Sequence, residues 1–123
     1  MTDRLPTPES GFAKDLLSQR RQREKLLGPE LAKEPAWTML LALFVAYEEG
    51  EQAVVMQLCT ETGTPPALAL RWLRTLASEG MVAWKTESAD PYRALVELEP
   101  GAADRLRRLF LTWMNGTNPA GPE

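Results

Sequence analysis

Arg71 and Arg74, three positions apart, are the side chains of this 123-residue chain whose type and spacing best suit binding chemistry. They lie in the segment 65–79, where apolar residues at helical spacing are expected to face a core: Ala69, Trp72, Leu73 and Leu76. A guanidinium pairs bidentately with phosphate oxygens or with the edge of guanine. Two arginines on the outward face of a short helix therefore indicate nucleic-acid contact, and the same pattern also fits a solvated helix face.

The chain contains no histidine and one cysteine, Cys59. Within this chain, Ser-His-Asp and Cys-His nucleophilic sites and His-ligated zinc are therefore excluded, as are an intrachain disulfide and a multi-cysteine metal site. We expect Cys59 to be a small buried apolar side chain. The neighbouring carboxylates Glu48 and Glu49 stand at a predicted helix end. The sequence thus predicts a binding protein rather than an enzyme, with no catalytic residue, metal site or cofactor.

The composition, 44% hydrophobic and 25% charged, is typical of one globular domain. No apolar run approaches the ~20 residues of a membrane span, and the first residues lack the apolar core of a signal peptide. We therefore expect a cytoplasmic protein. The chain has 14 basic and 17 acidic side chains, and residues 36–98 hold four basic against eight acidic ones. The composition alone does not give the strongly basic character that is usual for nucleic-acid binding.

Apolar spacing and cap residues predict five helices, at about 8–27, 35–49, 54–61, 65–79 and 102–114. The helix over 35–49 is apolar nearly all round, which indicates a central, buried element. Thr64 is expected to cap the helix that begins at Pro65, and the free amides at that end are suited to a phosphate. Two strands, 81–87 and 92–98, are expected to form a hairpin around the turn 88–91.

This order of elements resembles the winged helix-turn-helix domain of the MarR-like class of bacterial regulators. The residues that carry the resemblance are EPAWTMLL at 34–41, ALRWLRTL at 69–76, EGMV at 79–82 and the run 90–101. It covers most of the chain and implies a mainly α fold with a small β-hairpin wing. The implied layout is a flexible N-terminus (1–7), a dimerisation helix and connection (8–34), the winged helix-turn-helix (35–101), a C-terminal helix (102–114) and a disordered tail (115–123).

The resemblance further implies a transcriptional regulator that binds double-stranded DNA as a homodimer joined through its first and last helices. It places the helix 65–79 in the major groove and the wing, about 82–98, on the backbone or minor groove. Together with the outward face of that helix, this predicts the DNA-binding residues Thr64, Ala67, Leu70, Arg71, Arg74, Thr75, Lys85 and Arg93. The predicted dimerisation residues are Phe12, Leu16, Leu17, Leu109, Phe110 and Trp113. No residue identifies a small-molecule effector.

A second hypothesis is a protein-interaction module that keeps the winged-helix scaffold without sequence-specific DNA readout. Its basis is the acidic balance of residues 36–98 and the apolar first turn at Pro66, Ala67 and Leu68. Alanine and leucine can contact a thymine methyl but cannot hydrogen-bond a base edge. Likewise, the aromatic residues of the last helix fit either a dimer seam or packing within one chain.

Overall fold

The computed structural model describes residues 7–116, apart from the side chains of Glu9, Phe12 and Ala13. Its helices are α1 (Pro8–Leu27), α2 (Ala36–Glu49), α3 (Val55–Thr62), α4 (Pro66–Ser78) and α5 (Pro100–Met114). The strands are β1 (Ala53–Val54), β2 (Val82–Trp84) and β3 (Leu95–Leu98), and a 3-10 turn, η1, spans Pro91–Arg93. The flexible and disordered ends predicted from the sequence lie largely outside the described residues.

Capping residues fix the ends of α1 as predicted. The hydroxyl of Thr7 accepts the backbone N–H of Ser10, and the Ser10 hydroxyl accepts that of Thr7, so the helix begins with a capping box. Thr7 is therefore part of the described helix cap rather than of a loose terminus. The helix ends at Gly28, whose φ of 86° favours glycine. The predicted bounds of α1 are confirmed.

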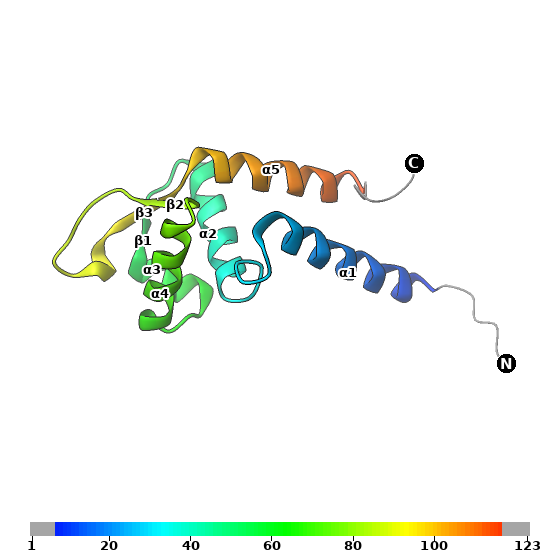
Figure 1. The fold of residues 1–123 in the computed structure, drawn as a ribbon, viewed down its shortest axis with the longest axis horizontal. Helices are drawn as coiled ribbons and strands as arrows, with labels where there is room; N and C mark the ends of the chain where they lie inside the picture. Colours follow the sequence, from blue (N-terminus) through cyan, green and yellow to red (C-terminus); the bar gives the residue numbers. More distant parts are fainter. Residues whose placement is uncertain (1–6, 117–123) are drawn as a thin grey trace.

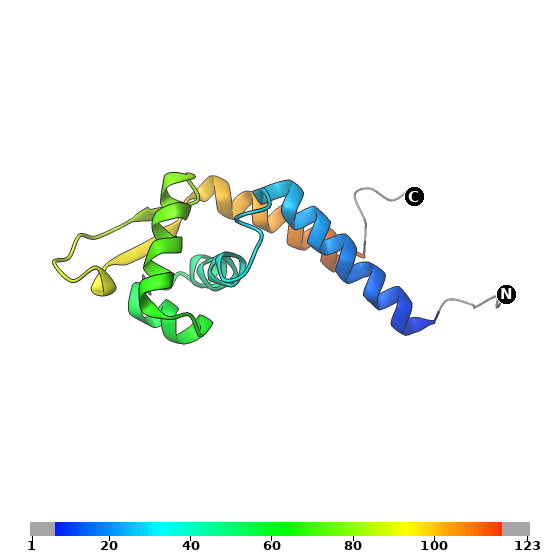
Figure 2. The same ribbon diagram turned by 60° about the horizontal axis from the view of Figure 1, so that its bottom comes forward.

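The core forms around α2, which lies in the middle of the molecule (Figures 1 and 2). Its Met39, Leu40 and Leu43 are fully buried, and α2 contacts α3, α4, α5 and β3. The predicted central position of this helix is confirmed, but its Leu41 and Val45 are exposed, so the helix is buried on one face and not all round. No helix among the described residues is long and apolar enough to cross a membrane.

The turn between α3 and α4 differs from the prediction at Thr64. Helix α3 ends at Gly63 (φ 66°), and the residue that caps α4 is Pro65, which has no side-chain capping bond. Thr64 is buried: its N–H donates to the Cys59 carbonyl at 3.0 Å, and its hydroxyl oxygen accepts from the Thr62 hydroxyl at 2.8 Å. The predicted Thr64 cap is wrong because its side chain turns back towards α3.

The sheet has three antiparallel strands in the order β1–β3–β2, with Ala53 opposite Val96 and Val82 opposite Leu98. Strand β1 was not predicted. The second wing strand is shorter than predicted, because η1 occupies Pro91–Arg93. The Asp90 carboxylate accepts the Tyr92 N–H at 3.0 Å, and the ring of Pro91 fixes φ, so the chain turns before β3 begins.

Figures 1 and 2 show the arrangement that positions the candidate site. The wing, the loop between β2 and β3, projects at one end of the molecule, beside α4. Helices α1 and α5 contact each other and extend together from the other end. The mainly α winged helix-turn-helix with added terminal helices is therefore confirmed as the fold.

Candidate nucleic-acid interface

Helix α4 presents an exposed stripe made of Ala67, Arg71, Arg74 and Ser78. The spacing of four, three and four residues places these side chains on one face, while Leu73 and Leu76 on the opposite face are fully buried. Among the described residues, neither Arg71 nor Arg74 forms an ion pair. The stripe thus offers two free guanidinium groups to whatever approaches α4.

Two predicted contact residues of α4 are less accessible than the sequence suggested. Leu70, placed on the outward face by helical spacing, is 7% exposed. It lines an open groove of about 430 Å³ between α4 and the wing, together with Arg74 and Trp84. Its predicted exposure is wrong, because Leu70 lies on the side of α4 that faces β2 and the wing. Thr75 is half-buried, and its hydroxyl donates to the Arg71 carbonyl at 3.2 Å.

Thr64 is also 6% exposed, so its side chain does not reach the surface at the start of α4. The first turn instead exposes Pro65, Pro66, Ala67 and Leu68. Among these, Leu68 is a large apolar side chain. A contact here would be made through apolar groups, such as the methyl group of thymine.

The cations of the wing are exposed but paired. The Lys85 ammonium lies 3.3 Å from a carboxylate oxygen of Glu97, across the strand pair, and Arg93 Nε lies 3.9 Å from Asp90 Oδ2. Exposed ion pairs of this kind contribute about 0–1 kcal/mol, so a phosphate can replace the carboxylate at small cost. Trp84, on β2, is also partly exposed beside Arg74.

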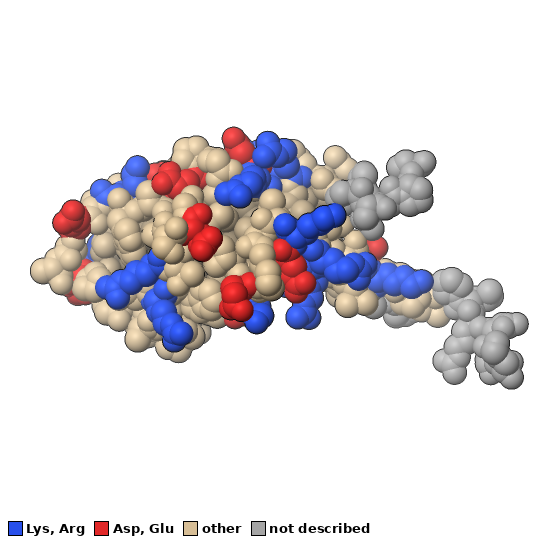
Figure 3. Space-filling model, in the orientation of Figure 1, with Lys and Arg blue, Asp and Glu red and all other residues tan. Residues whose placement is uncertain are grey.

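The surface charge is uneven on the face shown in Figure 3. Basic side chains gather over α4 and again along α1, and acidic side chains lie between the two groups. Within the described residues, no group of acidic or cysteine side chains is arranged to hold a metal ion. At α4 and the wing the exposed groups are guanidinium and ammonium cations, carboxylates and apolar side chains, which suit recognition by charge, hydrogen bonds and apolar contact.

The predicted dimerisation residues divide into two sets. Leu16 and Leu17 on α1 are 50% and 56% exposed, while the side chain of Phe12 lies outside the described residues. Leu109, Phe110 and Trp113 on α5 are instead partly buried against the core. Leu16 and Leu17 are not among the side chains packed against the core cluster.

Phe110 and Trp113 belong to an aromatic cluster inside the chain. The Phe110 ring lies 5.0 Å from Phe44 and 6.1 Å from Trp37, both on α2, and Trp113 lies 6.2 Å from Trp37. The indole N–H of Trp113 donates to Gln22 Oε1 on α1 at 2.6 Å. This cluster joins α1, α2 and α5, so packing within one chain accounts for both aromatic residues.

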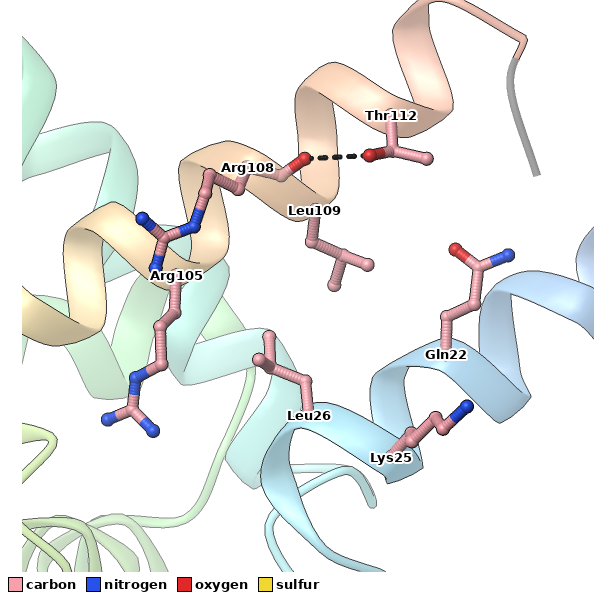
Figure 4. Close-up of a pocket in the computed structure, with 7 residues that line it drawn as sticks. All are labelled: Gln22, Lys25, Leu26, Arg105, Arg108, Leu109 and Thr112. Atoms are coloured by element: carbon pink, nitrogen blue, oxygen red, sulfur yellow. Dashed lines mark hydrogen bonds between the residues drawn. The ribbon is translucent and has the colours of Figure 1, made fainter. Parts of the chain in front are cut away.

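Other exposed side chains escaped the sequence analysis. Leu111 and Met114, near the end of α5, are 47% and 78% exposed. Lys25, Arg105 and Arg108 line a groove between α1 and α5 (Figure 4). The sequence signals for these residues are the apolar spacing of α5 and the run of basic side chains at 105–108.

Comparison with known proteins shows which solved structures share this fold. No protein-family model matches the sequence, and no curated protein matches it closely enough to count as a relative. A mutant of S. aureus MepR bound to an oligodeoxyribonucleotide is similar with a TM-score of 0.66 and 11% identity, covering 91% of this chain and 80% of that one. Wild-type MarR from E. coli gives 0.56 and 16%, covering 88% and 77%.

A MarR family transcriptional regulator from Silicibacter pomeroyi is similar with a TM-score of 0.57 and 19% identity, covering 94% of this chain and 80% of that one. At these identities the likeness establishes the fold that the chain shares with MarR-type regulators. The winged-helix architecture that the resemblance implied is the architecture of these proteins.

Proposed function

We propose that this chain is a DNA-binding transcriptional regulator that acts as a homodimer. In this proposal α4 enters the major groove, and the wing contacts the backbone or the minor groove. The observation that carries the proposal is the exposed stripe of α4, whose Arg71 and Arg74 have no ion-pair partner among the described residues. An unpaired guanidinium can bind guanine or phosphate without first giving up an internal carboxylate.

The similarity to a structure solved with DNA supports the same function. The S. aureus MepR mutant that shares this fold is bound to an oligodeoxyribonucleotide. In helix-turn-helix proteins the second helix of the pair is the one that lies in the major groove. In this chain that helix is α4, and its exposed stripe is the surface that would face the bases.

The homodimer is supported by apolar side chains left exposed where α1 and α5 extend from the core. They are Leu16, Leu17, Leu111 and Met114. Large apolar patches on a protein surface mark interaction surfaces, and these four side chains supply exposed apolar area on α1 and α5 for such a contact. A two-fold symmetric pair would present two copies of α4, and symmetric half-sites are usually separated by about one helical turn of DNA, ~34 Å.

Selection from a pool of randomised duplexes, followed by fluorescence anisotropy on the selected duplex, tests this function. We expect saturable binding that weakens as salt rises, because neutralising phosphates releases counterions. The Arg71→Ala/Arg74→Ala variant should bind more weakly and with a smaller salt slope. The slope falls by about 0.9 for each phosphate that the variant no longer neutralises, or by up to about 3.6 for both arginines in two copies.

The matched control is Lys14→Ala/Arg21→Ala, which removes two exposed charges from α1 instead. It should leave the affinity for the selected duplex nearly unchanged. Failure to select any duplex, or equally weakened binding in the two variants, would contradict the proposal.

A protein-interaction module is the second candidate function. It is favoured by the pairing of both wing cations with carboxylates and by the exposed apolar turn at 66–68. The acidic side chains between the basic groups in Figure 3 are also better suited to a protein surface than to a duplex. A stoichiometric protein partner that co-purifies from the native host without DNA would favour this function over the first.

A further inference from the structure

The side chains of α4 include few of the types that distinguish one base from another. The helix contains no asparagine, glutamine, aspartate or glutamate. Asparagine and glutamine are the side chains that pair with adenine in the major groove, and aspartate and glutamate are those that pair with cytosine. Arginine pairs with guanine, and apolar side chains contact the methyl group of thymine. The composition of α4 therefore favours contacts to guanine and thymine.

The hydroxyl groups of α4 are engaged within the helix. The Thr75 hydroxyl donates to the Arg71 carbonyl at 3.2 Å, and the Ser78 hydroxyl donates to the Thr75 carbonyl at 2.9 Å. Thr64, just before the helix, is 6% exposed. Hydrogen bonding from α4 side chains to base edges is therefore left to Arg71 and Arg74.

The first turn of α4 is apolar on its exposed side. Pro65 and Pro66 have no backbone N–H, and the Ala69 N–H donates to the Pro65 carbonyl at 2.9 Å. Ala67 is exposed, and Leu68 is 36% exposed. The backbone N–H groups of these two residues suit a phosphate, a contact that positions a protein on DNA without reading its sequence. Any base contact from this turn is made by methyl and methylene groups.

We propose that Ala67 and Leu68 select thymine in each half-site of the bound duplex, through contact with its C5-methyl group. This inference rests on the function proposed above, in which α4 lies in the major groove, and it adds which base the first turn reads. Ala67 and Arg71 are four residues apart, about 6 Å along the helix axis. Base pairs are stacked about 3.4 Å apart. The selected thymine should therefore lie about two base pairs from a guanine bound by Arg71.

Replacement of thymine by deoxyuridine in a duplex selected from a randomised pool tests the proposal, because uracil lacks only the C5-methyl group. Each thymine of the half-site is replaced in turn, and the Kd is measured by fluorescence anisotropy. We expect the replacement at one position to weaken binding about fourfold in one half-site and about fifteenfold in both. These factors correspond to the loss of one buried methyl contact per half-site. Deoxyuridine in the flanking sequence should leave the Kd unchanged.

Methylated cytosine separates the methyl contact from the hydrogen-bonding pattern of the base. Exchanging the selected T·A pair for C·G removes the methyl group and changes the base edges. With 5-methylcytosine in place of cytosine, the methyl group returns to the same place in the major groove. Because the first turn is expected to form no hydrogen bond to this base, we expect the methylated duplex to bind about fourfold more tightly than the unmethylated one.

The decisive protein variant is Ala67→Gly/Leu68→Ala, which removes the apolar groups that are expected to touch the methyl. Its Kd ratio between the deoxyuridine and thymine duplexes should fall from about four to about one. A purely structural effect on α4 would weaken both duplexes equally and leave the ratio unchanged. The matched control is Val45→Ala, which shortens an exposed apolar side chain on α2 and should keep the ratio at about four. Circular dichroism verifies folding, and the single variant Leu68→Ala serves if the double variant does not fold.

The outcomes separate this inference from the function on which it rests. If the chain bound no duplex, the proposed function would fail and the thymine contact with it. If the chain bound a selected duplex and deoxyuridine had no effect at any position of the half-site, the thymine contact alone would be overturned. A ratio that stayed at about four in Ala67→Gly/Leu68→Ala would overturn it as well, because the methyl group would then be read by other residues.

Discussion

Replacing Phe110 with alanine tests whether α5 is held within the chain or by a second copy. The ring contacts Trp37, Phe44 and Trp113 at centroid distances of 5.0–6.1 Å. Complete removal of a buried phenylalanine ring costs about 3–5 kcal/mol, and Phe110 is partly exposed, so the lower end applies. We therefore expect Phe110→Ala to lower the free energy of unfolding by about 3 kcal/mol and the Tm by about 10 °C.

Urea unfolding followed by circular dichroism at several protein concentrations measures this effect. The matched variant is Leu111→Ala, one residue along the same helix, whose side chain is largely exposed. Leu111→Ala should leave the unfolding of the dilute chain within about 0.5 kcal/mol of wild type and should shift the dimer equilibrium instead. If Phe110→Ala unfolded like wild type in dilute solution and differed only where dimers form, the intramolecular account of the aromatic cluster would be refuted.

Three further predictions concern the core, the Cys59 thiol and the ion pair that joins α2 to α5. Leu73→Ala, in the fully buried face of α4, should lower the free energy of unfolding by about 3 kcal/mol in urea titrations; a change under about 1 kcal/mol would mean that α4 does not pack as described. Burial raises the pKa of the Cys59 thiol, so Ellman's reagent should label the folded chain slowly and the unfolded chain at once. The folded state favours the protonated thiol. The stability that Cys59 contributes in this way is complete below the pKa of the thiol in the unfolded chain, about 8.5, and is lost as pH rises through its pKa in the folded chain. If the free energy of unfolding had the same pH dependence in Cys59→Ala, this reasoning would be contradicted. The Glu48 carboxylate, which accepts hydrogen bonds from the Arg107 guanidinium, raises the pKa of Arg107 and joins α2 to α5. Arg107→Gln and Glu48→Gln should each lower the Tm slightly, and the double variant should lower it no further than the larger single effect; additive decreases would show that the two residues act separately.

The helices were predictable because local chemistry sets their ends. Pro8 and Gly28 mark the ends of α1, and Gly50 follows α2 in the left-handed conformation (φ 68°). The continuous apolar character of α2 also identified the element at the centre of the core. These features depend on residues close together in the chain, which is why the sequence pattern was sufficient.

The sheet and part of the site depend on contacts between distant residues. Strand β1 is two residues long and exists through its pairing with β3, about forty residues later. Helical spacing placed Leu70 on the outward face, but that side of α4 faces β2 and the wing, and Leu70 is buried. The periodicity of apolar residues within α4 carries no information about its contacts with the wing.

The charge of the site was also set by tertiary structure. Glu97 lies beside Lys85 through the pairing of β2 with β3, whereas Arg93 is paired locally with Asp90, three residues before it in the chain. In the groove between α1 and α5, by contrast, tertiary structure brings cations together, since Lys25 is eighty residues from Arg105 in the sequence. Their gathering required the contact between α1 and α5.

Photo-crosslinking from Ala67 tests the central claim most directly, namely that the exposed stripe of α4 faces DNA. A benzophenone side chain in place of Ala67 projects from the stripe, and the same side chain in place of Val45, which is exposed on α2, serves as the control. With a selected duplex, we predict crosslinks to bases from position 67 and not from position 45. A bound duplex that crosslinks from position 45 and not from position 67 would contradict the account.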